Sequence, residues 1–361
     1  MPRKIIKSNS TIVAVSNNTD AFSTSNIDLN LYSVVQNANY SVSFNRQPLK
    51  QVGTQALASR ETLQQPDVQL NVAYIPEPRM ENEIYGNFIK VSDFTRYIHF
   101  FSGTLSNNNN FYILTHPEQS KDGLSDITMD GSDHNFSGWD AVAFGNCYPV
   151  SYGLSYGVGQ IPTASTSFIC SNMKFESLTG TSMESPAINL ESGNNNQVGL
   201  QVFQFDGGVK NPQIVNPMDT GSSVQLENLQ VGGQALSGIH FIQSLDLQVN
   251  LNRVSTYGLG SNFAYDRKAL LPAEGNFSVS SLVSGVNDGD VTGLVRNDSS
   301  YDFDLVLESS GGSRLAYKIQ GAKLDSYNYT MPVNGLMNYD ASFNFEITET
   351  SGLSISGKSY S

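Results

Sequence analysis

Two stretches of the sequence follow nearly the same pattern, and this repeat restricts the fold more than any other feature. Residues 40–54 read YSVSFNRQPLKQVGT, and residues 247–261 read LQVNLNRVSTYGLGS. In both, apolar residues alternate with polar ones, and an Asn-Arg pair is followed by a glycine seven positions after the arginine. Placing Arg46 on Arg253, which we call the first alignment, also sets Leu70 on Phe277 and Val72 on Val279. This gapless agreement predicts two copies of one long unit.

A second block repeats with a smaller separation between its copies. Ser151-Tyr152 falls on Ser326-Tyr327, Ser167-Phe168 falls on Ser342-Phe343, and we call this the second alignment. A looser match sets FYILT from Phe111 against FDLVL from Phe303. The separation shrinks because the first copy has more residues between its blocks. We therefore predict a first domain at 1–205, with an N-terminal arm and a long insert at about 75–144. A connecting segment rich in Gly, Pro and Asn follows at 206–235, and a second domain at 236–361.

Alternating apolar and polar residues recur along the chain and predict the secondary structure. NYSVSFN, DVQLNVAY, LDLQVNLN and ASFNFEIT each place apolar side chains at every second position, as in a strand with one buried face. The pattern is typical of antiparallel sheets. Helical periodicity is limited to PRMENEIYGNF at 78–88. We therefore expect an all-β protein with at most short helices.

Composition and charge exclude several classes of function. The formal net charge is −13, with a pI of about 4.6, so we expect no face that wraps nucleic acid. Charged residues make up 15%, against roughly 25% in soluble domains. The sequence contains no apolar run near the roughly 20 residues that a membrane helix needs, so we expect no membrane partner. Two cysteines, Cys147 and Cys170, fit a reducing cytoplasm better than a disulfide framework.

One motif resembles a catalytic serine. GLSYG at 153–157 matches the G-x-S-x-G nucleophile elbow, which requires a strand, a sharp turn and then a helix. Ser155 is instead followed by VGQIPTASTS, which is not a helical sequence. A serine on the polar side of a strand is the interpretation we favour, and we predict no catalytic residue.

Metal and cofactor sites have little support. The four histidines, His99, His116, His134 and His240, lack zinc-ligand spacing. Acidic loops around Asp126–Asp140 and at Asn287–Asp290 lack the terminal glutamate of a calcium loop, and turn-forming aspartates explain them. GLGSNF at 258–263 lacks the third glycine of a dinucleotide fingerprint. We therefore predict no metal and no cofactor.

The repeated arginines and glycines are the candidate structural or interface residues. Arg46 and Arg253 each follow an alternating strand. Either they are solvated, or each pairs with a carboxylate across a subunit joint, where the planar guanidinium allows bidentate contacts. Gly53 and Gly260 are expected to adopt backbone angles that other residues avoid.

Residues 34–86 resemble the major tail tube proteins of long-tailed bacteriophages. The resemblance is carried by the alternating strand, the segment from Arg46 to Gly53, the strand opening with Pro66-Asp67-Val68, and Asn82-Glu83 with Gly86. The second repeat keeps Arg253 and Gly260 but has no Asn-Glu segment. The resemblance implies two tandem tail-tube-like β-sandwich or half-barrel domains and a structural virion protein, in a tandem-duplicated form, without enzymatic activity.

The resemblance also implies the partners. Six domains of such proteins close into a ring, so a duplicated chain implies a homotrimer with pseudo-sixfold symmetry and stacking of rings. DNA would pass through without sequence-specific binding, and a tape-measure protein and a sheath are further expected partners. The protein would be assembled in the host cytoplasm and reside in the virion tail.

Two alternatives stay open from the sequence. The first is another virion component on a related fold, such as a tail hub, a tail terminator or a capsid decoration. The second is a β-rich carbohydrate-binding protein or an enzyme, although the chain has a single tryptophan, Trp139.

Overall fold

The computed structural model is built from β-strands. It describes residues 11–16, 28–31, 35–44, 46–50, 57–62, 67–76, 98–99, 109–116, 138–178, 185–187, 210–214, 223–231, 234–235, 242–257, 264–282, 300–308, 314–331 and 336–358. Every regular element in these residues is a strand, which confirms the predicted all-β class. The helix expected at 78–88 lies outside the described residues.

The strands divide between the two halves of the chain. Those of the first half are β1 (Thr11–Ser16), β2 (Asp28–Leu31), β3 (Val35–Ser43), β4 (Arg46–Lys50), β5 (Leu57–Thr62), β6 (Asp67–Tyr74), β7 (Ile98–His99), β8 (Asn109–Thr115), β9 (Asp140–Gly157) and β10 (Thr163–Ser177). They are followed by β11 (Lys210–Ile214), β12 (Ser223–Val231), β13 (Gln234–Ala235), β14 (Ile242–Asn250), β15 (Arg253–Tyr257), β16 (Ala264–Ala269), β17 (Ala273–Leu282), β18 (Tyr301–Glu308), β19 (Arg314–Thr330), β20 (Asn338–Ile347) and β21 (Leu353–Lys358).

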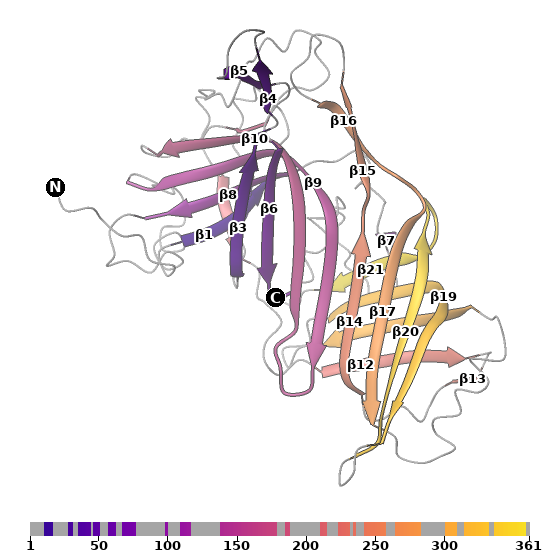
Figure 1. Cartoon of the computed structure of the whole chain (residues 1–361). Helices are drawn as coiled ribbons and strands as arrows, with labels where there is room; N and C mark the ends of the chain where they lie inside the picture. Colours follow the sequence, from indigo (N-terminus) through magenta and orange to yellow (C-terminus); the bar gives the residue numbers. More distant parts are fainter. Residues whose placement is uncertain are drawn as a thin grey trace.

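A broad antiparallel sheet, called the front sheet here, extends across both halves. Its strands follow the order β3, β6, β10, β9, β14, β17, β20 and β19 (Figure 1). The pairing of β9 with β14 connects the two halves, and we call it the internal joint. One long sheet therefore contains two four-stranded parts side by side.

Smaller back sheets pack behind the front sheet. In the first half, β8 pairs with the outer part of β9, and β1 pairs with β8. In the second half, β18 and β21 pair with β19, and β12 pairs with β18. The back strands run across the direction of the front strands (Figure 1). Since β9 and β19 belong to front and back sheets alike, each must bend. They do so at Asn146 and Gly321, whose φ angles of 49° and 72° lie in the left-handed region.

The core lies between the sheets and continues from one half into the other. A single hydrophobic cluster includes Leu70, Phe111 and Phe168 of the first half with Leu247, Phe303 and Phe343 of the second. The strand β6 shows why: Val68, Leu70, Val72 and Tyr74 are buried at every second position, as the alternating sequence requires. The Tyr152 and Tyr317 hydroxyl oxygens are 2.6 Å apart in this core, and their hydrogen bond links the two halves.

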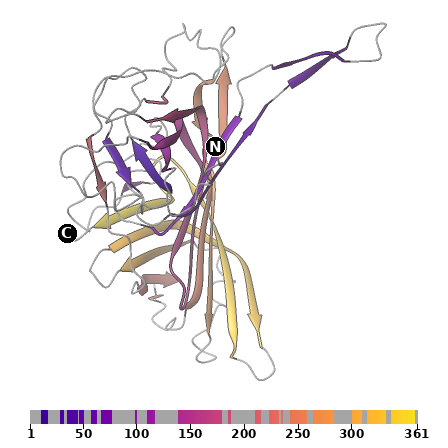
Figure 2. The ribbon, with the colours of Figure 1, turned by 90° about the vertical axis from the view of Figure 1, so that its left-hand side faces the viewer.

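The two halves share the same strand registers. Ser43 faces Asp67 in β3–β6, and Asn250 faces Glu274 in β14–β17, so both strands of each pair correspond through the first alignment. Register irregularities recur at the same places, after Val35 and after Ile242. The hairpins β4–β5 and β15–β16 also match, since Arg46 faces Thr62 and Arg253 faces Ala269. In Figure 2 the β4–β5 hairpin projects away from the sheets.

The connecting segment that we predicted at 206–235 contains strands. β11 runs parallel to β2, and β12 pairs with β18 in the back sheet of the second half. Residues 223–231 thus contribute to the second half and do not merely connect the halves. Sequence alternation in SVQLENLQV was the available signal for this strand.

The predicted insert at about 75–144 also contributes strands to the sheets. β8 has β18 as its counterpart, with Phe111 facing Phe144 as Phe303 faces Ile319. β7 pairs with β21, so a short piece of the first half extends the back sheet of the second.

Candidate functional site: a polar sheet face with two open edges

The outer face of the front sheet carries small polar side chains across its width. Register places Asn39, Asn71, Ser167, Ser151, Asn250, Glu274 and Glu346 in one row across seven strands. The neighbouring row contains Asn37, Ala73, Ser165, Gly153, Gln248, Asn276, Asn344 and Lys323. These positions alternate with the buried ones, so the same period of two that builds the core exposes this face.

Amide side chains on this face bond across strands. The Asn71 Nδ2 group donates to Asn39 Oδ1 at 3.0 Å, and Asn276 Nδ2 donates to Asn344 Oδ1 at 2.9 Å. Asn276 Nδ2 also lies 3.0 Å from Ser342 Oγ. Such cross-strand pairs hold part of the amide surface in place and satisfy hydrogen-bonding groups that would otherwise seek a ligand.

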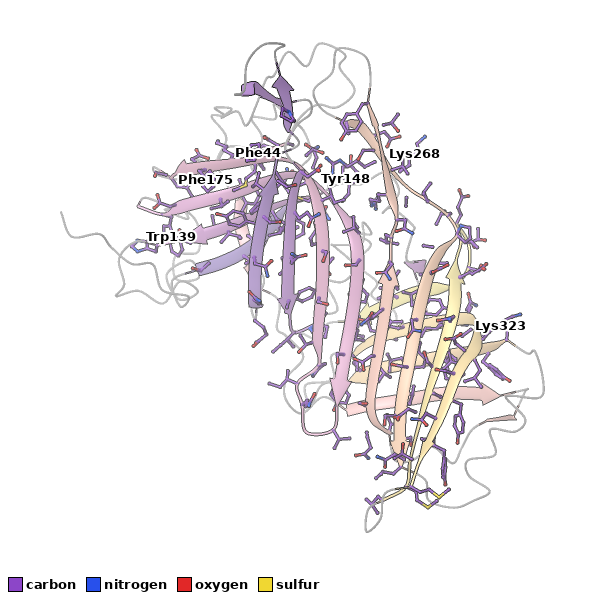
Figure 3. The ribbon with its side chains drawn as sticks, viewed as in Figure 1. Phe44, Trp139, Tyr148, Phe175, Lys268 and Lys323 are labelled. Atoms are coloured by element: carbon purple, nitrogen blue, oxygen red, sulfur yellow. The ribbon has the colours of Figure 1, made fainter. Side chains whose placement is uncertain are left out.

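The charges described on this face are mostly negative. Register places on it the carboxylates Asp67, Asp246, Glu274, Asp340 and Glu346, together with the cation Lys323 at the β19 edge (Figure 3). Carboxylates repel a phosphate backbone, and neutral amides and hydroxyls do not release counterions from it. The face is therefore suited to having nucleic acid nearby without retaining it.

Both outer edges of the front sheet are open within the described part of the chain. β3 pairs with β6 on one side, residues 323–330 of β19 pair with β20 on one side, and no described strand pairs with the other side of either. Apolar side chains remain accessible at these edges, with Tyr40 42%, Phe44 49% and Met331 66% exposed. Unpaired edges beside exposed apolar groups are typical of strands that acquire a partner.

The internal joint is closed by Arg253. Its Nε donates to the Pro149 carbonyl oxygen at 2.7 Å, and one terminal nitrogen donates to the Arg267 carbonyl oxygen at 2.8 Å. The guanidinium carbon lies 5.3 Å from the centre of the Tyr148 ring. Burial lowers the pKa of Arg253 to about 10, so it stays charged at neutral pH. Because Pro149 and Tyr148 belong to β9, this arginine ties β15 to the other half.

The predicted interface residues are only partly within the described structure. The solvated interpretation is wrong for Arg253, which is partly buried and bonded to backbone carbonyls. The β4 backbone places Arg46 opposite Thr62, and nothing is described of its side chain. Gly53 and Gly260 lie outside the described residues. A role of these four residues at a subunit joint stays a prediction.

The serine and histidine residues considered as catalytic or metal-binding candidates do not lie in surroundings that suit those roles. Ser155 is exposed within β9, facing Thr163 on one side and Asp246 on the other, so the strand-turn-helix context of a nucleophile elbow is not met there. His116 is buried with its ring 5.0 Å from that of Trp139. The described residues contain no group of three or more potential metal ligands, and no helix among them could span a membrane.

Sequence reasoning missed the residues that join the halves. Tyr152 belongs to a repeated block, but Tyr317 has no matching tyrosine in the first half, since the second alignment sets Val142 against it. The open edges were also missed, because alternation reports which face of a strand is buried and not where the strand lies in its sheet.

Comparison with known proteins gives structural similarities only. No family model matches the sequence, and no curated protein matches it. The tail tube of SPP1 matches with a TM-score of 0.30 and 13% identity over 57% of this chain and 99% of that chain. The tail of an empty GTA particle matches with a TM-score of 0.25 and 14% identity over 38% of this chain and 94% of that chain.

The virion of a native gene transfer agent also matches, with a TM-score of 0.25 and 10% identity over 38% of this chain and 96% of that chain. At these TM-scores, the function of this chain has to be inferred from its own geometry.

Proposed function

We propose that this chain is the structural subunit of a tubular virion tail. Three chains close into a ring in which the front sheets form one continuous barrel, and the rings stack into a tube that conducts DNA. Its role is to form a passage, without catalysis. The proposal is supported by the open edges, by the polar face and by the resemblance of residues 34–86 to tail tube proteins.

The internal joint is the observation that carries the proposal. Two four-stranded units with the same registers join head to tail through β9 and β14. Within the part of the chain that the structure describes, this leaves the outer side of β3 open at one end and the outer side of residues 323–330 of β19 open at the other. A head-to-tail contact that repeats must end in a closed ring or in an open filament. We propose that the chain is a tandem duplication and that three chains supply six units, in agreement with the ring size that the resemblance implies.

The polar face would line the passage. Among the described positions its charges are mainly carboxylates, and its neutral positions are amides, hydroxyls, Ala73 and Gly153. A lumen of this chemistry keeps phosphates from forming lasting ion pairs while remaining wetted. The core side chains would face away from the DNA, between the front and back sheets.

Further partners follow from this role. Rings would contact the rings above and below them, a tape-measure protein would occupy the lumen before DNA does, and a sheath could cover the outside. Assembly in the host cytoplasm and residence in the virion tail follow from the same proposal.

Electron microscopy and mass measurement of the purified full chain test the proposal. We expect trimers that stack into hollow tubes. Single rings that do not stack would favour a hub, a terminator or a capsid decoration, and a monomer at all concentrations would contradict the proposal. A variant with Val42→Pro, which removes a backbone donor from the β3 edge region, should block ring closure; a Val254→Pro variant in the β15 hairpin serves as the control.

A further inference from the structure

The internal joint shows in one chain how two units meet. In it, Leu247 faces Leu154 and Val249 faces Tyr152, and all four side chains are at most 1% exposed. On the polar side of the same strands, Gln248 faces Gly153. The joint therefore has a defined register, a buried apolar side and a polar side.

Each strand of this joint has an equivalent at an open edge. β14 corresponds to β3 through the first alignment, because Leu247 faces Phe277 as Tyr40 faces Leu70. β9 corresponds to β19 through the second alignment, because Ser151 faces Ser167 as Ser326 faces Ser342. A partner strand for β3 is thus present in the molecule at its opposite edge (Figure 1), where a single chain cannot bring the two together.

We infer that β19 of one chain pairs antiparallel with β3 of the next, in the register copied from the internal joint. Tyr40 then faces Tyr329, Val42 faces Tyr327, and Ser41 faces Asn328. The inference rests on the proposed function, since it specifies how one chain binds a second copy of itself, and it assigns the residues and the register of that contact.

The burial of equivalent residues supports a second copy of the chain as the partner of these edges. Leu247 is fully buried at the internal joint, whereas its equivalent Tyr40 is 42% exposed at the edge. Tyr152 and Leu154 are 1% exposed, whereas their equivalents Tyr327 and Tyr329 are only partly buried. The edge residues stand on the core side of the sheet, since their partners Leu70 and Ala341 are buried. A second copy of the chain would cover these edge residues, as the internal joint covers their equivalents Leu247, Tyr152 and Leu154.

Aromatic rings pack at both edges, and the side chains of the edges differ from those of the internal joint. Tyr40 lies against Phe144 with ring centres 5.4 Å apart, and Tyr327 lies between Tyr329 and Tyr339 at 6.5 and 5.9 Å. Tyrosines replace Leu247 and Leu154, so the joint between chains is more aromatic. Tyrosine tolerates water before assembly better than leucine does and contributes a large contact area once covered.

Disulfide trapping tests the register in the assembled full chain. Directly opposed residues of antiparallel strands have Cα atoms about 4.5–5.5 Å apart, within disulfide reach, whereas diagonal neighbours at about 7–8 Å are beyond it. The variant with Ser41→Cys and Asn328→Cys places one thiol on each edge, at exposed positions that leave the core unchanged. The variant with Ser41→Cys and Ser326→Cys is the matched control, shifted two positions along the same face.

On mild oxidation we expect the first variant to give covalent dimers and trimers on a non-reducing gel, and the shifted variant and each single variant to give little. The native Cys147 and Cys170 are buried and present in all variants. Efficient linkage in the shifted variant, or tubes that form without linkage in either, would overturn the register while the proposed function stands. Failure of the unmodified chain to form rings would overturn the proposed function itself.

Discussion

The first and second halves build the same front-sheet strand pairings, but with different side chains in one part of the core. In the first half, Val68 of β6 faces Cys170 of β10, and both are buried. The equivalent pair in the second half is Gly275 of β17 and Phe345 of β20. A Cβ at Gly275 would overlap the Phe345 ring. In the first half two residues of medium size share the space, whereas in the second half one large ring fills it beside a glycine. The strand register is therefore the same in both halves, although the sizes of the opposed side chains differ.

The largest expected effect comes from breaking this compensation. Gly275→Val should lower the free energy of unfolding by about 3 kcal/mol, because the added side chain must displace the Phe345 ring. Phe345→Cys alone should cost about 3 kcal/mol as well, through the cavity that it leaves. Denaturant unfolding of each variant provides the measurement.

The double variant sharpens the test, because it installs the pair of the first half in the second. We expect Gly275→Val with Phe345→Cys to be clearly more stable than the sum of the two single effects predicts. Additive losses would mean that the two positions do not share one volume.

A smaller effect is expected at the hydrogen bond that joins the halves. Tyr152→Phe should cost about 1–2 kcal/mol, since it removes the buried bond to the Tyr317 hydroxyl. Tyr317→Phe should cost a similar amount, and the double variant should cost less than the two together. Thermal unfolding of the unmodified chain, the two single variants and the double variant gives the coupling energy between the two tyrosines. A coupling energy near zero would mean that this hydrogen bond does not stabilise the internal joint.

The arginines distinguish the internal joint from the proposed joint between chains. Arg253→Lys should destabilise the single chain by about 1.5 kcal/mol, because lysine cannot contact the Pro149 and Arg267 carbonyls through one planar group. If Arg46 makes the same kind of contact only with a second chain, Arg46→Lys should leave unfolding of the monomer unchanged and weaken ring assembly. Unchanged assembly in the Arg46 variant would return it to the solvated alternative.

The smallest effect is expected where the long strands bend. Gly321 has a φ of 72°, and a Cβ added to it would meet no atom within 4 Å, so Gly321→Ala should cost only the backbone term of about 1 kcal/mol. Gly321→Asn should cost less, since Asn146 holds the equivalent place in the first half with a φ of 49°. Measured by denaturant unfolding, equal losses for alanine and asparagine would show that the two bends are not interchangeable.

Much of the fold could be predicted because one face of most strands is buried. The alternation in DVQLNVAY matches the buried residues of β6 one for one, and the all-β class follows from many such segments. The choice between helix and strand could be predicted from local sequence, because apolar residues at every second position can all reach the core only in a strand.

The site could be predicted less well, because it depends on neighbours rather than on periods. Arg253 was recognised as a repeated residue, but its contacts with Pro149 and Tyr148 join residues more than a hundred positions apart. The strand β12 was assigned to a connecting segment, because its partner β18 lies far along the chain.

The sequence by itself determined the all-β class, the buried side of strands such as β6 and the two alignments through which equivalent residues recur. Only the tertiary structure decided that β9 and β14 meet and that β3 and β19 are left as edges among the described strands. It alone also showed that Val68–Cys170 and Gly275–Phe345 fill equivalent places with side chains of different sizes. The reason is physical. Alternation records whether a side chain is buried, whereas the choice of neighbouring strand depends on backbone hydrogen bonds and on packing between residues distant in the chain.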